Sequence, residues 1–135
     1  MIDPLLLLFL SSGLFLGWSL GANDAANVFG TAVGTQMLTW RSAALICSIF
    51  VVLGAFISGA GTTSTLGKLG AISALPGAFM TALSAALSVF AMPRAGLPVS
   101  TSQAIVGAII GWNLFSYNPT DSVVLTKIIG TWIIC

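Results

Sequence analysis

The sequence predicts an all-α protein that crosses a membrane several times. Hydrophobic residues make up 57% of its 135 residues and charged residues only 5%, whereas soluble domains carry about 25% charged residues. The seven charges leave uncharged runs over residues 42–67, 69–93 and 95–120, and each run exceeds the roughly 20 apolar residues that a spanning helix needs. We therefore expect a single multi-pass domain over residues 1–135 in the cell membrane, in contact with the lipid bilayer. The net charge of +1 gives no sign of a nucleic-acid partner.

The first apolar segment, residues 4–39, is too long for one upright span. As a continuous helix it would be about 54 Å long, against a hydrocarbon core of about 30 Å. The segment must therefore tilt strongly, break or form two shorter pieces. A broken first helix is expected, with the break at the polar positions 21–27. Its apolar start is similar to a signal peptide, but it lacks a basic leader and the apolar character continues, so we expect a retained helix.

The remaining segments predict shorter helices separated by connectors. The expected elements are helices over 42–59, 75–91 and 99–115, an irregular Gly/Ser/Thr-rich connector over 58–70 and a polar loop over 116–121. A last apolar run, 122–135, would be only about 21 Å long as a helix, which is short for a crossing. We therefore expect the chain to be part of something larger, either as a fragment or as a half-unit.

One charge lies inside the first apolar segment, in the stretch GWSLGANDAANVFGTAVG. Asp24 is the only charged residue between positions 4 and 40. A carboxylate at the centre of a membrane helix costs about 2.5–3.5 kcal/mol on insertion scales, so it is retained where it faces a cavity, a cation or a partner. The structural alternative is that Asp24 caps a half-helix or pairs with a basic side chain.

The neighbours of Asp24 favour a cation site. Helical spacing places Asp24 and Asn27 on one face, and Asn23 is adjacent. Gly21 and Gly30 are expected to loosen the backbone and to free carbonyl groups for coordination. Carboxylate, carboxamide and carbonyl oxygens together suit a hard cation such as Na⁺, or a proton on Asp24.

A second polar cluster lies in GLPVSTSQAIVGAIIG, where Pro98 is followed by hydroxyls and an apolar helix. This pattern is typical of a helix N-terminus, whose free N–H groups and dipole bind phosphate-like anions. The alternative is an ordinary Ser/Thr helix cap. The residues of this cluster are Ser100, Thr101, Ser102 and Gln103.

An enzymatic function is not expected, and no cofactor is expected beyond a coupling ion. The chain has no histidine for a Ser–His pair, and the one Asp at membrane depth lacks the second carboxylate of an aspartyl mechanism. Cys47 and Cys135 lie in apolar runs and are interpreted as small hydrophobic residues.

The two motifs together resemble a known family. GANDAANVFGTAVG, residues 21–34, closely resembles the GAND-type signature of the inorganic phosphate transporter (PiT) family, the sodium- or proton-coupled phosphate permeases. GLPVSTSQAIVGAIIG, residues 96–111, resembles the Pro-Val-Ser-Thr segment of the same family. The resemblance implies two inverted repeats, each with one GAND motif and one Ser/Thr-rich re-entrant or broken helix, with phosphate and the coupling ions where the repeats meet.

The resemblance implies roles for the two polar clusters. Asn23, Asp24 and Asn27 would lie in the ion and substrate site. Ser100, Thr101 and Ser102, with Gln103, would surround inorganic phosphate. The implied function is ion-coupled transport of phosphate across the cytoplasmic membrane.

Two departures from the family pattern matter. Many members have His where this chain has Gln103, which favours Na⁺ over a proton as the coupling ion. Only one GAND motif is present, so the chain matches one repeat, and the other repeat is expected from the same full-length chain or from a second subunit. The alternatives are transport of another tetrahedral oxyanion such as sulfate, and a non-transporting membrane assembly subunit in which Asp24 packs against a partner helix.

Overall fold

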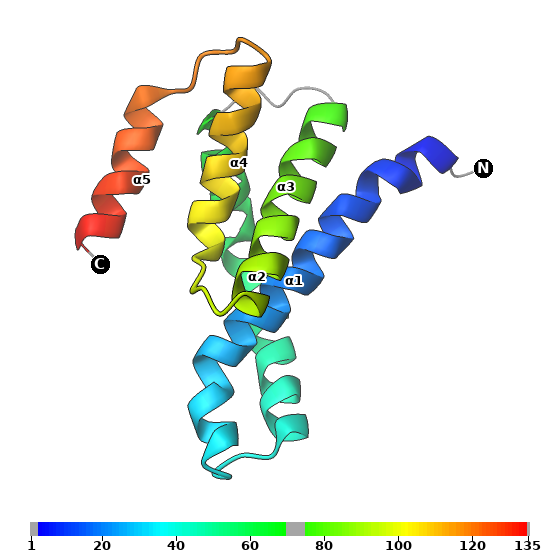
Figure 1. The fold of residues 1–135 in the computed structure, drawn as a ribbon, viewed down its shortest axis with the longest axis vertical. Helices are drawn as coiled ribbons and strands as arrows, with labels where there is room; N and C mark the ends of the chain where they lie inside the picture. The colour runs from blue at the N-terminus through cyan, green and yellow to red at the C-terminus, as the bar shows by residue number, and fades with distance from the viewer. Residues whose placement is uncertain (1–2, 70–74, 135) are drawn as a thin grey trace.

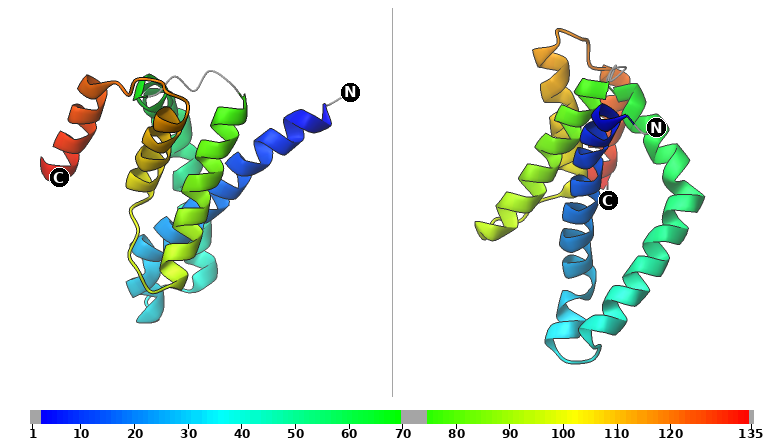
Figure 2. Two further views of the ribbon diagram at one scale, coloured as in Figure 1. Left: turned by 45° about the horizontal axis from the view of Figure 1, so that its top comes forward. Right: turned by 90° about the vertical axis from the view of Figure 1, so that its right-hand side faces the viewer.

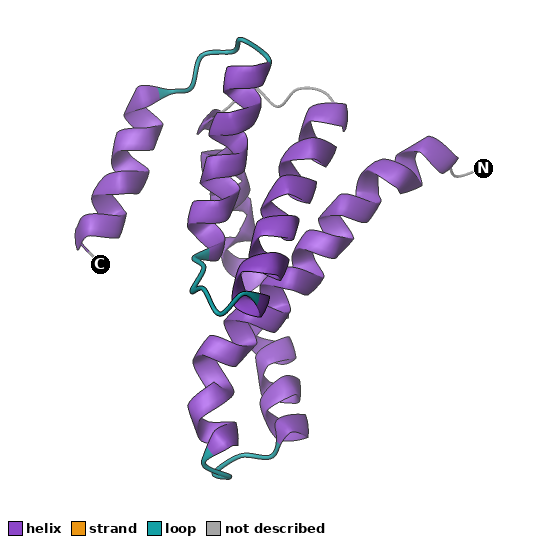
Figure 3. Cartoon of the chain, viewed as in Figure 1, coloured by secondary structure: helices purple, strands orange, loops and turns teal. Residues whose placement is uncertain are grey.

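Five helices joined by short loops form the part of the chain that the computed structural model describes, residues 3–69 and 75–134. They are α1 (Pro4–Gly34), α2 (Trp40–Leu69), α3 (Leu75–Arg94), α4 (Thr101–Phe115) and α5 (Ser122–Ile134) (Figure 1). Figure 3 shows helices and loops without a strand in these ranges. The prediction of an all-α protein is confirmed. Helices α1, α2 and α3 are each long and apolar enough to cross a membrane.

Helix α1 continues without a break through its polar positions, so the prediction of a broken first helix is wrong. Its 31 residues correspond to about 46 Å, and Figure 1 shows it inclined to α3 and α4. Asp3 caps its start by accepting a hydrogen bond from the backbone N–H of Leu5 at 3.0 Å. Within this continuous helix the Asn23 carboxamide donates to the Asp24 carboxylate at 3.1 Å, so these two side chains bond to each other rather than to the backbone of the helix.

Helix α2 also extends beyond its expected end. The prediction that 58–70 is irregular is wrong up to Leu69, and residue 70 lies outside the described ranges. The hydroxyls of this stretch bond back to carbonyls one turn earlier, as Thr63 does to Gly59 at 2.8 Å and Thr65 does to Gly61 at 3.0 Å. Such bonds place hydroxyls on a helix while its backbone hydrogen bonds stay intact.

Helix α3 is central to the packing. It has extensive contacts with α1 on one side and α4 on the other, whereas α2 contacts α1 and α5 less. Aromatic pairs join α1 to α3: the rings of Phe15 and Phe90 lie 5.6 Å apart. The right-hand view of Figure 2 shows α2 diverging from α1 after the loop that connects them.

A junction around Asn113 connects the ends of three helices. Asn113 is fully buried and donates from Nδ2 to the carbonyl of Leu69 at 3.4 Å and to Thr120 Oγ1 at 3.0 Å. The backbone N–H of Asp121 donates to the same Leu69 carbonyl at 3.2 Å. Leu69 also packs in an apolar cluster with Val106 and Ile109. This Asn113 junction therefore holds the end of α2 and the start of α5 against α4.

Much of the apolar surface remains uncovered by the chain itself. Phe56 and Ile57 of α2 are 86% and 82% exposed, and Leu14 of α1 is 77% exposed. Large apolar patches of this kind are rare on water-soluble proteins and fit contact with lipid or another membrane segment. The Ser/Thr-rich helix α4 is unbroken, and its 15 residues give about 22 Å, which is shorter than the hydrocarbon core.

Candidate functional site

The polar residues of the first motif, in α1, lie partly in a cavity and partly on the exposed surface beside it. Asn23 and Asn27, one turn apart, line a cavity of about 270 Å³ between α1 and α3. Asp24 is exposed beside that cavity and accepts the hydrogen bond from Asn23. The three residues predicted to hold a cation are thus neighbours, but the cavity groups Asn27 with Asn23 rather than with Asp24.

The structural roles considered for Asp24 find little support in this geometry. Asp24 lies in the middle of a continuous helix, so it does not cap a half-helix. Its hydrogen-bond partner is the carboxamide of Asn23 rather than a basic side chain. The exposed carboxylate therefore retains oxygen lone pairs that can accept a ligand.

Sequence reasoning missed Arg94, which lines the same cavity from the last turn of α3. Its Nη1 donates to the carbonyl of Phe90 at 2.7 Å, and its guanidinium lies 3.4 Å from the centre of the Phe90 ring. Its charge is visible in the sequence. Its position beside Asn23 and Asn27 depends on how α3 packs against α1, and no spacing along the chain predicts that.

The second motif forms the start of α4. Gly96, with φ +73°, allows the chain to turn after α3. Ser100 is the N-cap of α4, and its Oγ accepts a weak hydrogen bond from the backbone N–H of Gln103 at 3.4 Å. The first N–H groups of a helix lack partners within the helix, and the dipole makes this end attractive to anions.

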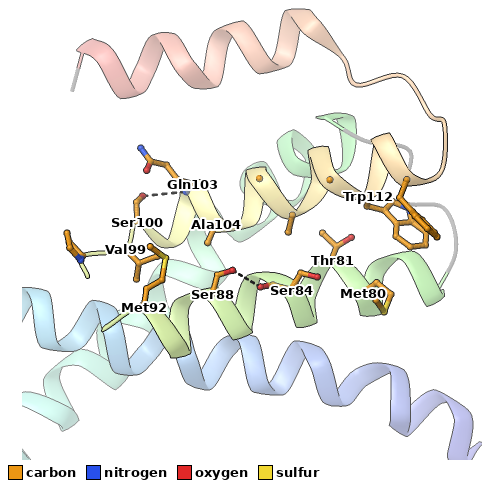
Figure 4. Close-up of a pocket in the computed structure, with 15 residues that line it drawn as sticks. Met80, Thr81, Ser84, Ser88, Met92, Val99, Ser100, Gln103, Ala104 and Trp112 are labelled. Carbon is orange, nitrogen blue, oxygen red and sulfur yellow. Dashed lines mark hydrogen bonds between the residues drawn. The ribbon is translucent and has the colours of Figure 1, made fainter. Parts of the chain in front are cut away.

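Ser100 and Gln103 line a cavity of about 670 Å³ between α3 and α4 (Figure 4). Figure 4 shows Ser84 and Ser88 of α3 facing this space and the Gln103 side chain directed away from α3. The Ser88 hydroxyl donates to the carbonyl of Ser84 at 2.9 Å. Ser100 thus lines the cavity and lies next to the N–H groups at the helix end.

The next hydroxyls of the motif face elsewhere, because successive residues of a helix point about 100° apart. Thr101 is half-buried. Ser102 lines a third cavity, of about 500 Å³, between α2, α4 and α5. The α2 hydroxyls that share this cavity, and that sequence reasoning did not single out, belong to Ser58, Thr62 and Thr65. The sequence does mark these residues, because they belong to the hydroxyl-rich stretch SGAGTTSTLGK.

Comparison with known proteins identifies the chain's relatives. Residues 20–135, which include both motifs, match the model of the phosphate transporter family. The chain belongs to this family. The family resemblance inferred from the two motifs is therefore confirmed, and with three helices able to span a bilayer the chain is a multi-pass membrane protein. No solved structure matches it.

Members of the phosphate transporter family from distant organisms resemble the chain, and they are named as proposed phosphate permeases. The Mycobacterium bovis protein is 41% identical over 108 positions, which cover 73% of this chain and 20% of the relative. The Thermococcus kodakarensis protein is 30% identical over 150 aligned positions, which cover 98% of this chain and 35% of the relative. The Haemophilus influenzae protein is 31% identical over 134 positions, which cover 90% of this chain and 32% of the relative. The chain spans about a fifth to a third of the length of these relatives.

Proposed function

We propose that the chain forms part of an ion-coupled transporter of inorganic phosphate. One observation carries the proposal: in a chain of the phosphate transporter family, the Ser100-capped N-terminus of α4 opens onto a cavity of about 670 Å³. A helix N-terminus supplies directed N–H donors and a favourable dipole, so it binds phosphate without a fixed positive charge. Weak fixed charge at a site suits a transporter, which must release its substrate as well as bind it.

In this proposal Ser100, Thr101, Ser102 and Gln103 supply the phosphate contacts. Only Ser100 and Gln103 line the cavity between α3 and α4, and the Gln103 side chain is directed away from α3. Ser100 is therefore the first of the four to test. Thr101 and Ser102 would contribute through their backbone N–H groups at the helix end.

The coupling ion in this proposal is Na⁺, held by Asn23, Asp24 and Asn27. Asp24 supplies the negative charge and the carboxamides supply neutral oxygens, which is a ligand set for a hard monovalent cation. A proton carried by Asp24 is the second candidate. Na⁺ is preferred because the chain contains no histidine, the side chain that most readily carries protons near neutral pH.

The transport path is proposed to need a second unit. Transporters of inverted-repeat architecture bind substrate where two repeats meet, and the chain spans about a fifth to a third of its relatives. The missing unit is the second repeat, in the same polypeptide or in a second subunit. The exposed apolar faces of α1 and α2 are available to contact it.

The experiment is uptake of radiolabelled phosphate by proteoliposomes that contain the protein of which this chain is part. We expect uptake driven by an inward Na⁺ gradient and a weak response to sulfate competition. Uptake of sulfate in preference to phosphate would assign a different oxyanion. Absence of uptake of either anion, from a protein that is folded and inserted, would contradict the transport proposal and favour an assembly role.

A further inference from the structure

The cavity between α1 and α3 carries a full positive charge, unlike the α3–α4 cavity and the cavity between α2, α4 and α5. Its polar lining consists of Ser19, Asn23, Asn27 and Arg94, and the remaining lining residues are apolar or aromatic. No acidic side chain belongs to this lining, because Asp24 lies outside it. The cavity has a volume of about 270 Å³, which leaves room for a small inorganic ion with some of its water.

Ser19 provides an independent sign that a ligand belongs there. Its side chain is 3% exposed, and its buried Oγ has no hydrogen-bond partner in the described structure. Serine hydroxyls in membrane helices usually bond back to a carbonyl of the preceding turn, as Ser12 does to Phe9 at 3.1 Å. A buried hydroxyl without a partner is costly, so its presence in a cavity wall calls for an external acceptor or donor.

The positive charge of Arg94 indicates that the ligand of this cavity is negatively charged. Arg94 is the last residue of α3 and is exposed, and it lines the cavity together with Asn27, which lies about two turns before the end of α1. Among the side chains that line this cavity it is the one that carries a charge. One N–H of Arg94 is used by the Phe90 carbonyl, and the planar guanidinium offers further donors in a geometry that matches oxyanions.

The carboxamides can serve an anion and a cation at once. Asn23 directs one N–H toward Asp24, and each carboxamide of Asn23 and Asn27 carries both donors and an acceptor oxygen. Donors directed into the cavity would contact an anion. The Asp24 carboxylate would contact the coupling cation, with carboxamide oxygens as its neutral ligands, so the two ligands would bind next to each other.

We propose that the α1–α3 cavity is an oxyanion site, with Arg94 as its charged anchor and Ser19, Asn23 and Asn27 as its hydrogen-bond donors. The inference rests on the proposed function in taking the oxyanion to be phosphate. Residues 95–99 connect Arg94 to Ser100, so the site lies at the same end of the α3–α4 hairpin as the N-terminus of α4. Phosphate bound at Arg94 would be held beside the proposed transport site.

The test is equilibrium binding of labelled phosphate to the purified protein that contains this chain, with thermal unfolding measured in parallel. Arg94→Gln should weaken one class of phosphate site by about ten- to hundredfold, the range for a lost hydrogen bond to a charged group. Arg94→Lys, which keeps the charge, should retain most of the affinity. The matched control is Arg41→Gln, which removes a positive charge from the exposed start of α2 and should leave binding unchanged.

A second variant keeps the test decisive if Arg94→Gln is unstable. Ser19→Ala is nearly isosteric and removes a hydroxyl that has no partner among the described residues, so it should weaken phosphate binding about tenfold or more without lowering thermal stability. Unchanged phosphate affinity in folded Arg94→Gln or Ser19→Ala protein would overturn the inference. If the unmutated protein transports phosphate while these variants bind it normally, the proposed function stands and only the Arg94 site fails. If the unmutated protein does not transport phosphate but binds it in a way that depends on Arg94, the oxyanion site is supported and the proposed transport function fails.

Discussion

At the residue scale, three adjacent hydroxyls that look alike in the sequence have different surroundings. Ser100 caps α4 and faces the α3–α4 cavity, Thr101 is half-buried, and Ser102 faces a cavity on the other side of α4. The distinction between helix cap and phosphate ligand can therefore be tested residue by residue. Ser102 offers a matched control for Ser100, because it is the same residue type two positions further along.

We predict that Ser100→Ala weakens apparent phosphate affinity by about ten- to hundredfold, as expected for a lost hydrogen bond to an anion. The hydroxyl's contact with the N–H of Gln103 is long, at 3.4 Å, so the stability cost should lie at the lower end of the cap range, about 0.5 kcal/mol. Phosphate binding and thermal unfolding of Ser100→Ala and Ser102→Ala distinguish the roles. Loss of stability with phosphate affinity intact in Ser100→Ala would make Ser100 a cap alone.

We predict that Asp24→Asn abolishes most Na⁺-driven phosphate uptake while expression and insertion stay near normal. The carboxamide oxygen can still accept the hydrogen bond that Asn23 now donates to Asp24, and removing a charge lowers the cost of membrane insertion. The matched control is Asp121→Asn, which removes a carboxylate that caps the start of α5 but lies outside the proposed ion site. Uptake near the unmutated level in Asp24→Asn would remove Asp24 from the coupling mechanism.

Part of the candidate site could be found from the sequence because its polar residues lie within apolar segments. Asp24 and the hydroxyls after Pro98 stand out in apolar surroundings, so they could be selected without a structure. Arg94 and the partnerless hydroxyl of Ser19 could not, because Arg94 follows a proline in an ordinary-looking turn and serine is common in apolar helices. Both gain significance only from the packing of α3 on α1, a contact between segments far apart in the chain.

At the element scale, the positions of the helices could be predicted better than whether each helix is continuous or interrupted. The apolar runs located α3, α4 and α5 within a few residues, and the polar loop 116–121 is confirmed. The predicted interruptions of α1 and α2 do not occur. Glycine and hydroxyl residues weaken helices in water, where the backbone can bond to solvent, whereas an apolar environment leaves the helical ladder as the best partner for every backbone group.

We predict that Gly77→Ala destabilises the contact between α3 and α4. A Cβ at Gly77 would lie 2.8 Å from the Trp112 ring atom Cε2, and the rigid indole must move to relieve this overlap, which typically costs about 1–3 kcal/mol. The control is Gly13→Ala in α1, where nothing lies within 4 Å of the added Cβ. Thermal unfolding should show a lower midpoint for Gly77→Ala and an unchanged or higher one for Gly13→Ala. Equal midpoints would contradict the close packing.

At the scale of the whole molecule, the chain provides extensive helix surface and a small interior. Its buried apolar residues are few, and large side chains of α2 such as Phe50 and Phe56 are exposed. The relatives are about three to four times as long as this chain, since 73% of the chain matches 20% of one relative and 98% of the chain matches 35% of another. In the proposed transporter, a second unit would cover these open faces, next to the separate cavities of the two motifs.

We predict that phosphate uptake by the whole protein depends on Na⁺ more than on a proton gradient, because the proposed ion site contains a carboxylate and carboxamides and the chain has no histidine. Replacing external Na⁺ with choline should reduce initial uptake rates in proteoliposomes severalfold or more. A protonophore added in the presence of Na⁺ should have little effect. Full uptake in Na⁺-free buffer that a protonophore abolishes would assign proton coupling instead.

The Asn113 junction has a consequence for the order of biosynthesis. Asn113 is 44 residues further along the chain than Leu69, whose carbonyl it binds, and the N–H of Asp121 arrives later still. At elongation rates of about 5–20 residues per second, the ribosome needs roughly 2–9 s to make that interval. During this time the carboxyl end of α2 lacks its hydrogen bonds to Asn113 and Asp121, although α2 can already contact α1. The end of α2 can therefore be fixed at this junction only after α4 has been synthesised.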